Sequence, residues 1–248
     1  MSTDAVLSET ISLRGHGGDL IPAYLARPLG DGPYPGVVVI HHMPGYDAAT
    51  KEIVRTFAVN GYTALCPNLH HREAPGAAPA DASRAVREAG GVPDDRCIGD
   101  VRAAAGHLRD LPSSNGKVGV IGYCSGGRQA YLVACSLPFD AAVDCYGGGV
   151  VASPDQLTER TPVAPIDLTA DLSCPLLGLF GAQDKRPSPA DVAKIEAELT
   201  RHGKTFDLHT YPDAGHAFFS VDRPNYRVEA ALDGWRRIWD FFGRHLQA

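Results

Sequence analysis

The stretch that decides the fold is Val118-Gly119-Val120-Ile121-Gly122-Tyr123-Cys124-Ser125-Gly126-Gly127-Arg128. An apolar run ends there in Gly-X-Cys-X-Gly-Gly, and a helix-like stretch, residues 128–137, follows it. This is the pattern of a nucleophile elbow, with cysteine where serine usually stands. The flanking glycines matter because the nucleophile sits on a strained strand-to-helix turn, where a side chain would collide with neighbouring backbone. Such a turn exposes the sulfur at a helix N-terminus, which favours a thiolate and can hold an oxyanion.

The rest of the chain predicts an α/β fold. Residues 6–13 and 21–27 alternate in polarity on either side of a glycine-rich segment, which predicts an antiparallel N-terminal hairpin. Predicted strands follow at residues 36–40, 62–66, 117–123, 141–146, 176–180 and 206–211, and predicted helices at 51–60, 95–111, 128–137, 189–201 and 226–246. This alternation predicts a mostly parallel sheet with helices on both faces. No linker divides residues 1–248, so we expect a single domain.

Two segments are less regular. Residues 75–93 are rich in alanine, proline and glycine and predict a loop with one short helix, whereas residues 147–172 predict a long irregular segment. In the closing helix the apolar side chains share one face, which is Leu232, Trp235, Ile238, Trp239 and Phe242.

Composition limits the classes of partner. A formal net charge of −6 without a basic stripe argues against nucleic acid. The N-terminus lacks the basic start and long apolar core of a signal peptide, and no stretch is long enough to cross a bilayer. We therefore expect a cytoplasmic protein, a monomer or small homo-oligomer, with a small-molecule partner and no membrane or nucleic-acid partner.

The six cysteines are Cys66, Cys97, Cys124, Cys135, Cys145 and Cys174. They form no C-x-x-C pair, so the spacing predicts neither a zinc site nor a disulfide framework. Five of them are expected to be small buried apolar residues. Cys124 is the exception because of its turn.

Reactive residue types follow three of the predicted strands. Cys124 follows residues 117–123, Asp184 follows residues 176–180, and His216 follows residues 206–211. Nucleophile, acid and histidine in this order is the chain order of α/β-hydrolases, and ligands bind beyond the carboxyl ends of parallel strands. A thiolate attacks, an imidazole moves the proton, and a carboxylate orients the imidazole.

Each of these residues also has a structural interpretation. Cys124 fits a buried cysteine in a turn at a nucleotide site, and Asp184 fits a capping or loop carboxylate. Asp213 is a rival acid close to His216, itself one of ten histidines. The shared order and strand-end position favour the catalytic interpretation.

An oxyanion hole needs two N–H donors. One follows the nucleophile, which is Ser125 here. The other comes from the loop after an earlier strand, His41-His42-Met43-Pro44-Gly45. Pro44 has no N–H, so Met43 is the predicted donor.

The chain resembles the dienelactone hydrolases, a cysteine-nucleophile branch of the α/β-hydrolases, over nearly its whole length. The motifs that carry the resemblance are Gly122-Tyr-Cys-Ser-Gly-Gly127, Asn115-Gly-Lys-Val-Gly-Val-Ile121, Gly61-Tyr62, Cys66-Pro-Asn-Leu69, Ala74-Pro-Gly76, Tyr146-Gly147, Gly181-Ala-Gln-Asp184 and Ala214-Gly-His-Ala-Phe218. The resemblance implies a cofactor-free ester or lactone hydrolase with the triad Cys124, Asp184 and His216. It also implies an acyl-thioester intermediate that water releases.

The departures from the family concern the substrate pocket. His42 stands where the family has a glutamate beside the resting cysteine. An imidazolium favours a thiolate whereas a glutamate disfavours it, so we expect Cys124 to be more ionised and more easily oxidised than the family's cysteine. Of the family's two carboxylate-binding arginines, one aligns with Arg87 and the other with Ser220, near Arg223. We expect His42, Arg87, Tyr123 and Tyr146 to line the pocket.

The pairs His41–His42 and His70–His71 follow strands that are predicted neighbours, so their imidazoles could converge on a metal ion. No carboxylate or cysteine spacing completes a ligand set, and we predict pocket-lining residues and no metal. The leading interpretation is thus an ester or lactone hydrolase. The alternatives are a general carboxylesterase or thioesterase, and a catalytically silent small-molecule-binding or redox-sensing module.

Overall fold

The computed structural model describes residues 5–247. Its strands form an eight-stranded sheet in the order β1-β2-β4-β3-β5-β6-β7-β8 over these residues, and the prediction of a mostly parallel sheet behind an antiparallel hairpin is confirmed. The chain forms two compact units, residues 1–120 with 158–162 and residues 121–157 with 163–248. Residues 1–4, part of the segment on which the signal-peptide prediction rests, lie outside the described range.

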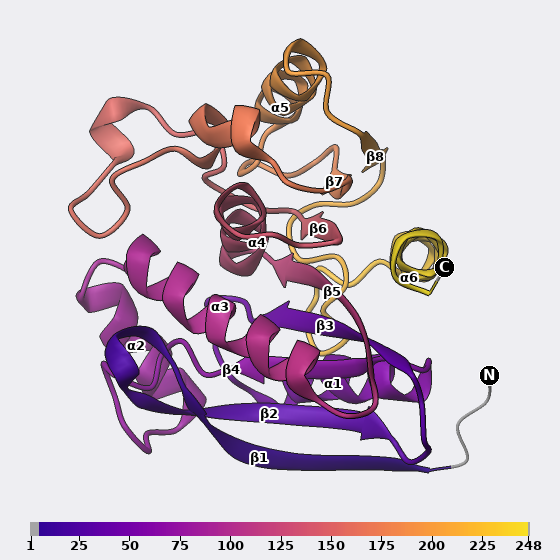
Figure 1. The fold of residues 1–248 in the computed structure, drawn as a ribbon. Coiled ribbons are helices and arrows are strands. Elements are labelled where there is room, and N and C mark those ends of the chain that lie inside the picture. Colours follow the sequence, from indigo (N-terminus) through magenta and orange to yellow (C-terminus); the bar gives the residue numbers. More distant parts are fainter. Residues whose placement is uncertain (1–4, 248) are drawn as a thin grey trace. The chain divides into compact units, whose positions relative to one another are not determined.

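The first unit begins with the predicted hairpin (Figure 1). β1 (Val6–Arg14) pairs antiparallel with β2 (Leu20–Pro28) through a 3-10 turn, η1 (His16–Gly18), in which Gly17 and Gly18 adopt positive φ angles. β2 pairs antiparallel with β4 (Thr63–Pro67), and β4 pairs parallel with β3 (Tyr34–Ile40). The side chains of β4 are buried throughout, as a strand covered on both faces requires.

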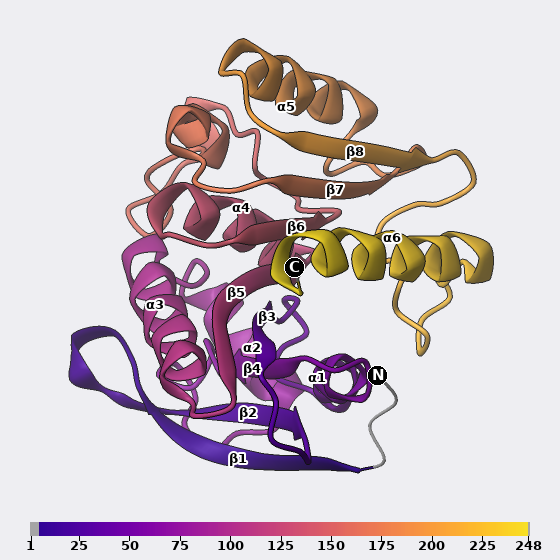
Figure 2. The same cartoon turned by 45° about the vertical axis from the view of Figure 1, so that its right-hand side comes forward.

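Helices α1 (Ala48–Val59) and α3 (Asp94–Asp110) cover opposite faces of the strands β2, β4 and β3 (Figures 1 and 2). The short helix predicted within residues 75–93 is α2 (Pro79–Glu88), with proline at its first position. α1 begins earlier than its apolar pattern predicts because Asp47 caps it, its carboxylate accepting the Thr50 N–H at 2.8 Å.

The second unit contains the end of β5 (Ser114–Tyr123) and three parallel strands. These are β6 (Ala141–Cys145), β7 (Leu176–Gly181) and β8 (Phe206–Tyr211). α4 (Ser125–Ser136) and α6 (Val228–Leu246) lie on opposite faces of β6 and β7 (Figure 2), and α5 (Pro189–Arg201) precedes β8. The segment predicted to be irregular, residues 147–172, contains two 3-10 helices, η2 (Pro154–Gln156) and η3 (Pro165–Asp171).

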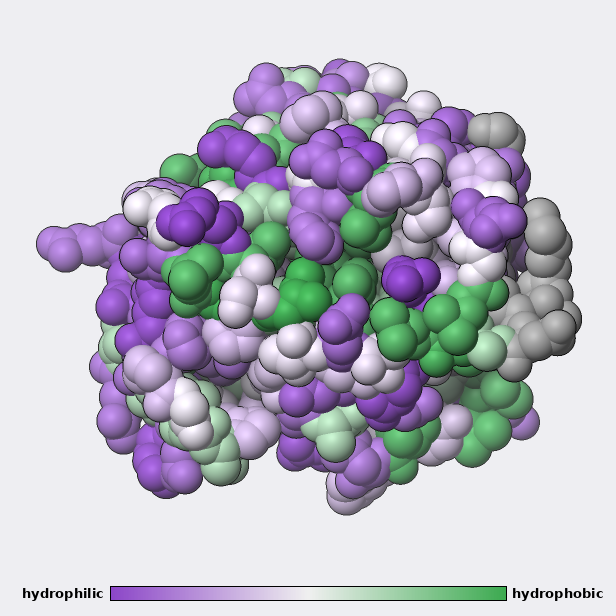
Figure 3. All heavy atoms as spheres, turned by 60° about the horizontal axis from the view of Figure 1, so that its bottom comes forward, coloured by the Kyte–Doolittle hydropathy of each residue, from purple (hydrophilic) through white to green (hydrophobic). Residues whose placement is uncertain are grey.

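One prediction about α6 is wrong. Leu232 is 64% exposed rather than part of the buried face, which is centred on Gly234, Ile238 and Phe242. Other large apolar side chains are also exposed among the described residues, namely Leu20, Leu29, Val59, Val221 and Val228. Figure 3 shows one face of the molecule, on which hydrophilic residues surround smaller groups of hydrophobic ones. Within residues 5–247, no helix combines the length and apolar content that crossing a bilayer requires.

Candidate active site

Cys124 occupies the predicted sharp turn between β5 and α4. Its backbone adopts φ 57° and ψ −119°, a conformation that non-glycine residues rarely take. Two hydrogen bonds hold it: the Cys124 N–H donates to the Cys145 carbonyl at 3.0 Å, and the Cys124 carbonyl accepts the Gly127 N–H at 2.9 Å. A Cβ on Gly122 would collide with the Gly126 carbonyl, so the elbow closes only with glycine there.

The elbow places the sulfur at the start of a helix. Ser125 is the first residue of α4, whose first N–H groups have no partner inside the helix and carry its positive end. Cys124 is half-buried, whereas the other five cysteines are buried, as predicted. The environment of Cys124 therefore suits a reactive thiolate.

The structure brings the three predicted triad side chains together in the second unit. His216 Nε2 lies 3.0 Å from Cys124 Sγ, and His216 Nδ1 lies 2.8 Å from Asp184 Oδ2. The Asp184 side chain is only 2% exposed, and its Oδ1 accepts the Arg186 N–H at 2.9 Å. Asp213, the rival acid, is exposed and lies outside this hydrogen-bonded chain.

The pKa of His216 follows from these contacts. Burial by itself lowers it, but the hydrogen bonds to Asp184 and Cys124 and their negative charges outweigh burial and raise the pKa to about 10. At neutral pH the ring is then protonated, and it lies between the Cys124 sulfur and the Asp184 carboxylate. The Asn225 side-chain amide also donates to the His216 carbonyl at 3.0 Å, which fixes the loop after β8.

The His216 ring packs against Tyr146, which belongs to a cluster of aromatic side chains. Tyr146, which has a positive φ of 44°, packs edge-on against His216 with ring centroids 5.2 Å apart. Tyr123 packs against Phe219 with centroids 5.8 Å apart. Tyr123 and Tyr146 are only 4% and 2% exposed, and of these two rings it is Tyr146 that packs against His216. Ser220, at the position of a family arginine, is a hydrogen-bond partner of Tyr146.

The other predicted pocket residues belong to the first unit, and their roles stay predictions. Met43 is half-buried in the loop after β3, and Arg87 is exposed in the last turn of α2. His42 Nε2 lies 2.8 Å from Asp47 Oδ2. Burial alone raises the pKa of Asp47, but hydrogen bonds from His42 and Thr50 lower it to about 2.

His41 and His70 are structural residues of the first unit. His41 Nδ1–H donates to the His42 carbonyl at 2.9 Å and its Nε2 accepts the Leu69 N–H at 3.2 Å. Burial lowers the pKa of His41 to about 4 and that of His70 to about 3, so both are neutral at pH 7. Their rings pack edge-on at 4.5 Å. Across residues 5–247, no group of three or more histidine, cysteine or acidic side chains could hold a metal ion.

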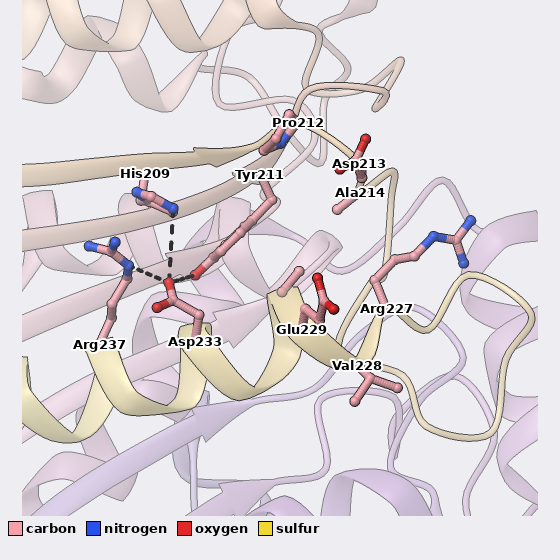
Figure 4. Close-up of a pocket in the computed structure, with 11 residues that line it drawn as sticks. His209, Tyr211, Pro212, Asp213, Ala214, Arg227, Val228, Glu229, Asp233 and Arg237 are labelled. Carbon is pink, nitrogen blue, oxygen red and sulfur yellow. Dashed lines mark hydrogen bonds and ion pairs between the residues drawn. The ribbon is translucent and has the colours of Figure 1, made fainter.

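Two pockets open in the second unit. One of about 310 Å³ is lined by the triad residues Asp184 and His216 together with Gln183, Lys185, Gly215, Asn225 and Arg227. The other, about 560 Å³, lies between β8 and α6 and contains no triad residue (Figure 4). In it Asp233 accepts the Tyr211 hydroxyl at 2.9 Å and Arg237 Nε at 2.6 Å, so its central carboxylate is already neutralised.

Lys185 and Arg227 were not predicted as site residues. Lys185 directly follows the triad acid, which is a signal that the sequence does contain. Arg227 precedes α6 and comes next to His216 only through the loop after β8, so sequence spacing did not indicate it. Arg223, which is near Ser220 in the sequence, lies 3.8 Å from Asp222 and lines neither of these pockets.

Comparison with known proteins gives one consistent result. The profile of the dienelactone hydrolase family matches residues 21–246. A carboxymethylenebutenolidase of Pseudomonas putida is 31% identical over 241 residues, 95% of this chain and 96% of that protein. A Methylorubrum extorquens protein assigned the same name is 34% identical over 228 residues, 91% of this chain and 77% of that protein.

A solved structure agrees with these sequences. A Klebsiella pneumoniae protein assigned to the dienelactone hydrolases superimposes with a TM-score of 0.88 at 30% sequence identity. The match covers 97% of this chain and 100% of that one. The likeness thus extends over both compact units.

Proposed function

Because this chain belongs to the dienelactone hydrolase family, we propose that it is a carboxylic ester hydrolase that cleaves ester or lactone bonds of small molecules. Cys124 is the nucleophile, His216 transfers the proton and Asp184 orients His216. No cofactor takes part in the proposed steps, which run through an acyl-thioester intermediate.

The observation that carries this proposal is the position of the His216 ring, 3.0 Å from the sulfur of Cys124 and 2.8 Å from the Asp184 carboxylate. An imidazole between a nucleophile and a buried carboxylate is the arrangement that acyl transfer through a covalent intermediate needs. The strained backbone of Cys124 supports the same conclusion, since such strain is kept mainly at functional sites.

The first half of the reaction forms the acyl-thioester. The Cys124 thiolate attacks the carbonyl carbon, a C–S bond forms, and the carbonyl π electrons move to oxygen. The N–H of Ser125, at the start of α4, holds this oxyanion, and such a donor is typically worth about 3 kcal/mol. The tetrahedral intermediate then collapses, the C–O bond breaks, and the leaving oxygen takes the proton from His216 Nε2.

The second half releases the acid. Loss of the thiolate charge removes one of the causes that raise the pKa of His216, so the ring stays neutral more readily in the acyl-enzyme and is available to accept a proton. Neutral His216 takes a proton from water, and the resulting hydroxide adds to the thioester carbonyl. Collapse breaks the C–S bond, frees the carboxylic acid and restores the thiolate–imidazolium pair.

The test is steady-state hydrolysis of p-nitrophenyl acetate and of a dienelactone by the wild-type protein, Cys124→Ala and Cys174→Ala. Cys174 is a buried free cysteine of the same unit and serves as the matched control. We expect turnover by the wild type and Cys174→Ala and none above background by Cys124→Ala. Turnover that survives in Cys124→Ala would refute the assigned nucleophile.

The same assay separates the alternatives. A general carboxylesterase or thioesterase turns over neutral aryl esters or thioesters without any preference for lactones. A silent small-molecule-binding or redox-sensing module shows no Cys124-dependent turnover of either compound, a result that would reject the hydrolase proposal.

A further inference from the structure

Asp144, in β6, is a buried carboxyl group for which the proposed reaction has no use. It is 1% exposed. Its Oδ1 accepts the Gly147 N–H at 2.7 Å, whereas its Oδ2 is buried without a hydrogen-bond partner among the described residues. Burying a carboxyl with half of its acceptors unused costs free energy, so its presence calls for a compensating role.

The carboxyl lies against the first turn of the helix that carries the nucleophile. A Cβ on Gly127, in that turn, would collide with Asp144 Oδ1, and so would a Cβ on Gly147. The next residue along β6, Cys145, supplies the carbonyl that accepts the Cys124 N–H at 3.0 Å. Asp144 therefore packs directly beneath the helix start that faces the sulfur.

The same carboxyl also closes the turn that supports His216. The bond from Gly147 N–H to Asp144 Oδ1 spans Tyr146, which is held at a φ of 44°. In that conformation the Tyr146 ring packs 5.2 Å from the His216 ring. One side chain thus contacts the backbone that positions Cys124 and the turn that positions His216.

We propose that Asp144 is a positioning residue for the Cys124–His216 pair, and that loss of its proton weakens the reactivity of that pair. This inference rests on the proposed function. Neutral Asp144 leaves the positive end of α4 free to stabilise the thiolate and the oxyanion. Ionised Asp144 places a negative charge beneath that end and opposes both.

Among residues 5–247, no cationic side chain is hydrogen-bonded to the Asp144 carboxyl. From α4, Tyr131 faces it, with the Tyr131 hydroxyl bonded to Thr169 at 2.7 Å. The Arg128 side chain, also on α4, instead donates to the Val163 carbonyl at 3.1 Å. From β6 the buried Cys145 thiol is its neighbour. Burial raises the pKa of Asp144 to about 7, and the Gly147 bond offsets only part of this effect, so the group titrates near neutral pH.

The experiment compares wild type, Asp144→Asn and the control Asp240→Asn, which alters an exposed carboxylate of α6. Asparagine keeps an oxygen for Gly147 but cannot ionise. We expect kcat/KM of the wild type and of Asp240→Asn to show an ionisation near pH 7, with a loss of up to about tenfold on its alkaline side. Asp144→Asn should lack this step, and an unchanged profile in Asp144→Asn would overturn the proposal.

Asp144→Ala, which removes the Gly147 bond, should lower kcat with little change in KM, while Asp144→Asn retains kcat at acid pH. If Asp144→Ala fails to fold, the pH profile of kcat/KM for Asp144→Asn still tests the proposal. The rate of Cys124 alkylation by iodoacetamide, measured over the same pH range, needs no turnover. This alkylation rate should show the ionisation near pH 7 in the wild type and should lack it in Asp144→Asn. Absence of hydrolysis with the step present would count against the proposed function alone, whereas absence of the step would count against Asp144.

Discussion

The raised pKa of His216 sets how the Cys124 sulfur responds to pH. A pKa of about 10 keeps His216 protonated beside the Cys124 sulfur at neutral pH, and this positive charge favours the thiolate over the thiol. Between about pH 7 and 9 we therefore expect no rise in the rate at which iodoacetamide alkylates Cys124, and only the fall of up to about tenfold that ionisation of Asp144 produces. His216→Ala should follow an ordinary thiol with a pKa near 8.5 and react at least about tenfold more slowly at pH 6.5. A wild-type rate that itself rises with a pKa near 8.5 would contradict the ion pair.

His42 offers a second residue-level prediction. An imidazole in place of the family glutamate is expected to favour the Cys124 thiolate, and Asp47 holds this ring at 2.8 Å. His42→Glu should therefore slow both alkylation and peroxide oxidation of Cys124 several-fold at pH 7. His71→Glu, an equal charge change in the first unit, is the control. Unchanged alkylation in His42→Glu would show that His42 does not act on the sulfur, and faster alkylation would contradict the predicted direction.

At the level of elements, the elbow between β5 and α4 depends on glycine. A Cβ on Gly122 meets the Gly126 carbonyl, a backbone atom that cannot move without opening the turn. Gly122→Ala should lower the free energy of unfolding by about 2–3 kcal/mol and abolish Cys124-dependent activity. Gly243→Ala in α6, where the nearest atom to a Cβ is 3.9 Å away, should be neutral or stabilising by up to about 1 kcal/mol. Urea unfolding and ester hydrolysis of both variants check this, and an active, stable Gly122→Ala would show that the elbow tolerates a side chain.

The elements themselves were largely predictable because apolar runs and glycine or proline stops are local signals. α5 begins and ends as predicted, and so does β8. The errors came from non-local contacts. α4 starts at Ser125 rather than residue 128 because Cys124, held by Cys145, serves as its N-cap. Leu232 has the spacing of the apolar face of α6, but it is exposed. Which residues of that face are buried depends on what packs against the helix, and sequence periodicity does not contain this information.

For the whole molecule, the sequence predicted the triad because parallel strands bring their carboxyl ends to one edge of a sheet, so residues far apart in sequence meet there. It did not indicate Asp144, which reads as one polar residue in an apolar strand. Its burial arises only when Gly127 and Gly147 approach it, and that approach is a property of the folded chain. The same holds for Arg227, which reaches the pocket beside His216 only through the folded loop after β8.

Asp144 also links the stability of the whole molecule to pH. Its pKa is about 7 in the folded protein and near 3.9 in the unfolded chain. Between these values the folded state binds more protons than the unfolded state, so this group makes the free energy of unfolding fall as pH rises towards 7. Above pH 7 the ionised Asp144 carboxylate lowers the free energy of unfolding by its full amount. Asp144→Asn cannot ionise, so burial of its amide lowers the free energy of unfolding by the same amount at every pH. Relative to the wild type, the urea midpoint of Asp144→Asn should therefore rise between pH 5 and pH 8. The corresponding difference in the free energy of unfolding should grow by an amount on the order of a few kcal/mol. Asp240→Asn should show no such trend. A relative midpoint of Asp144→Asn that stays constant or falls over this range would mean that Asp144 is already ionised at pH 5.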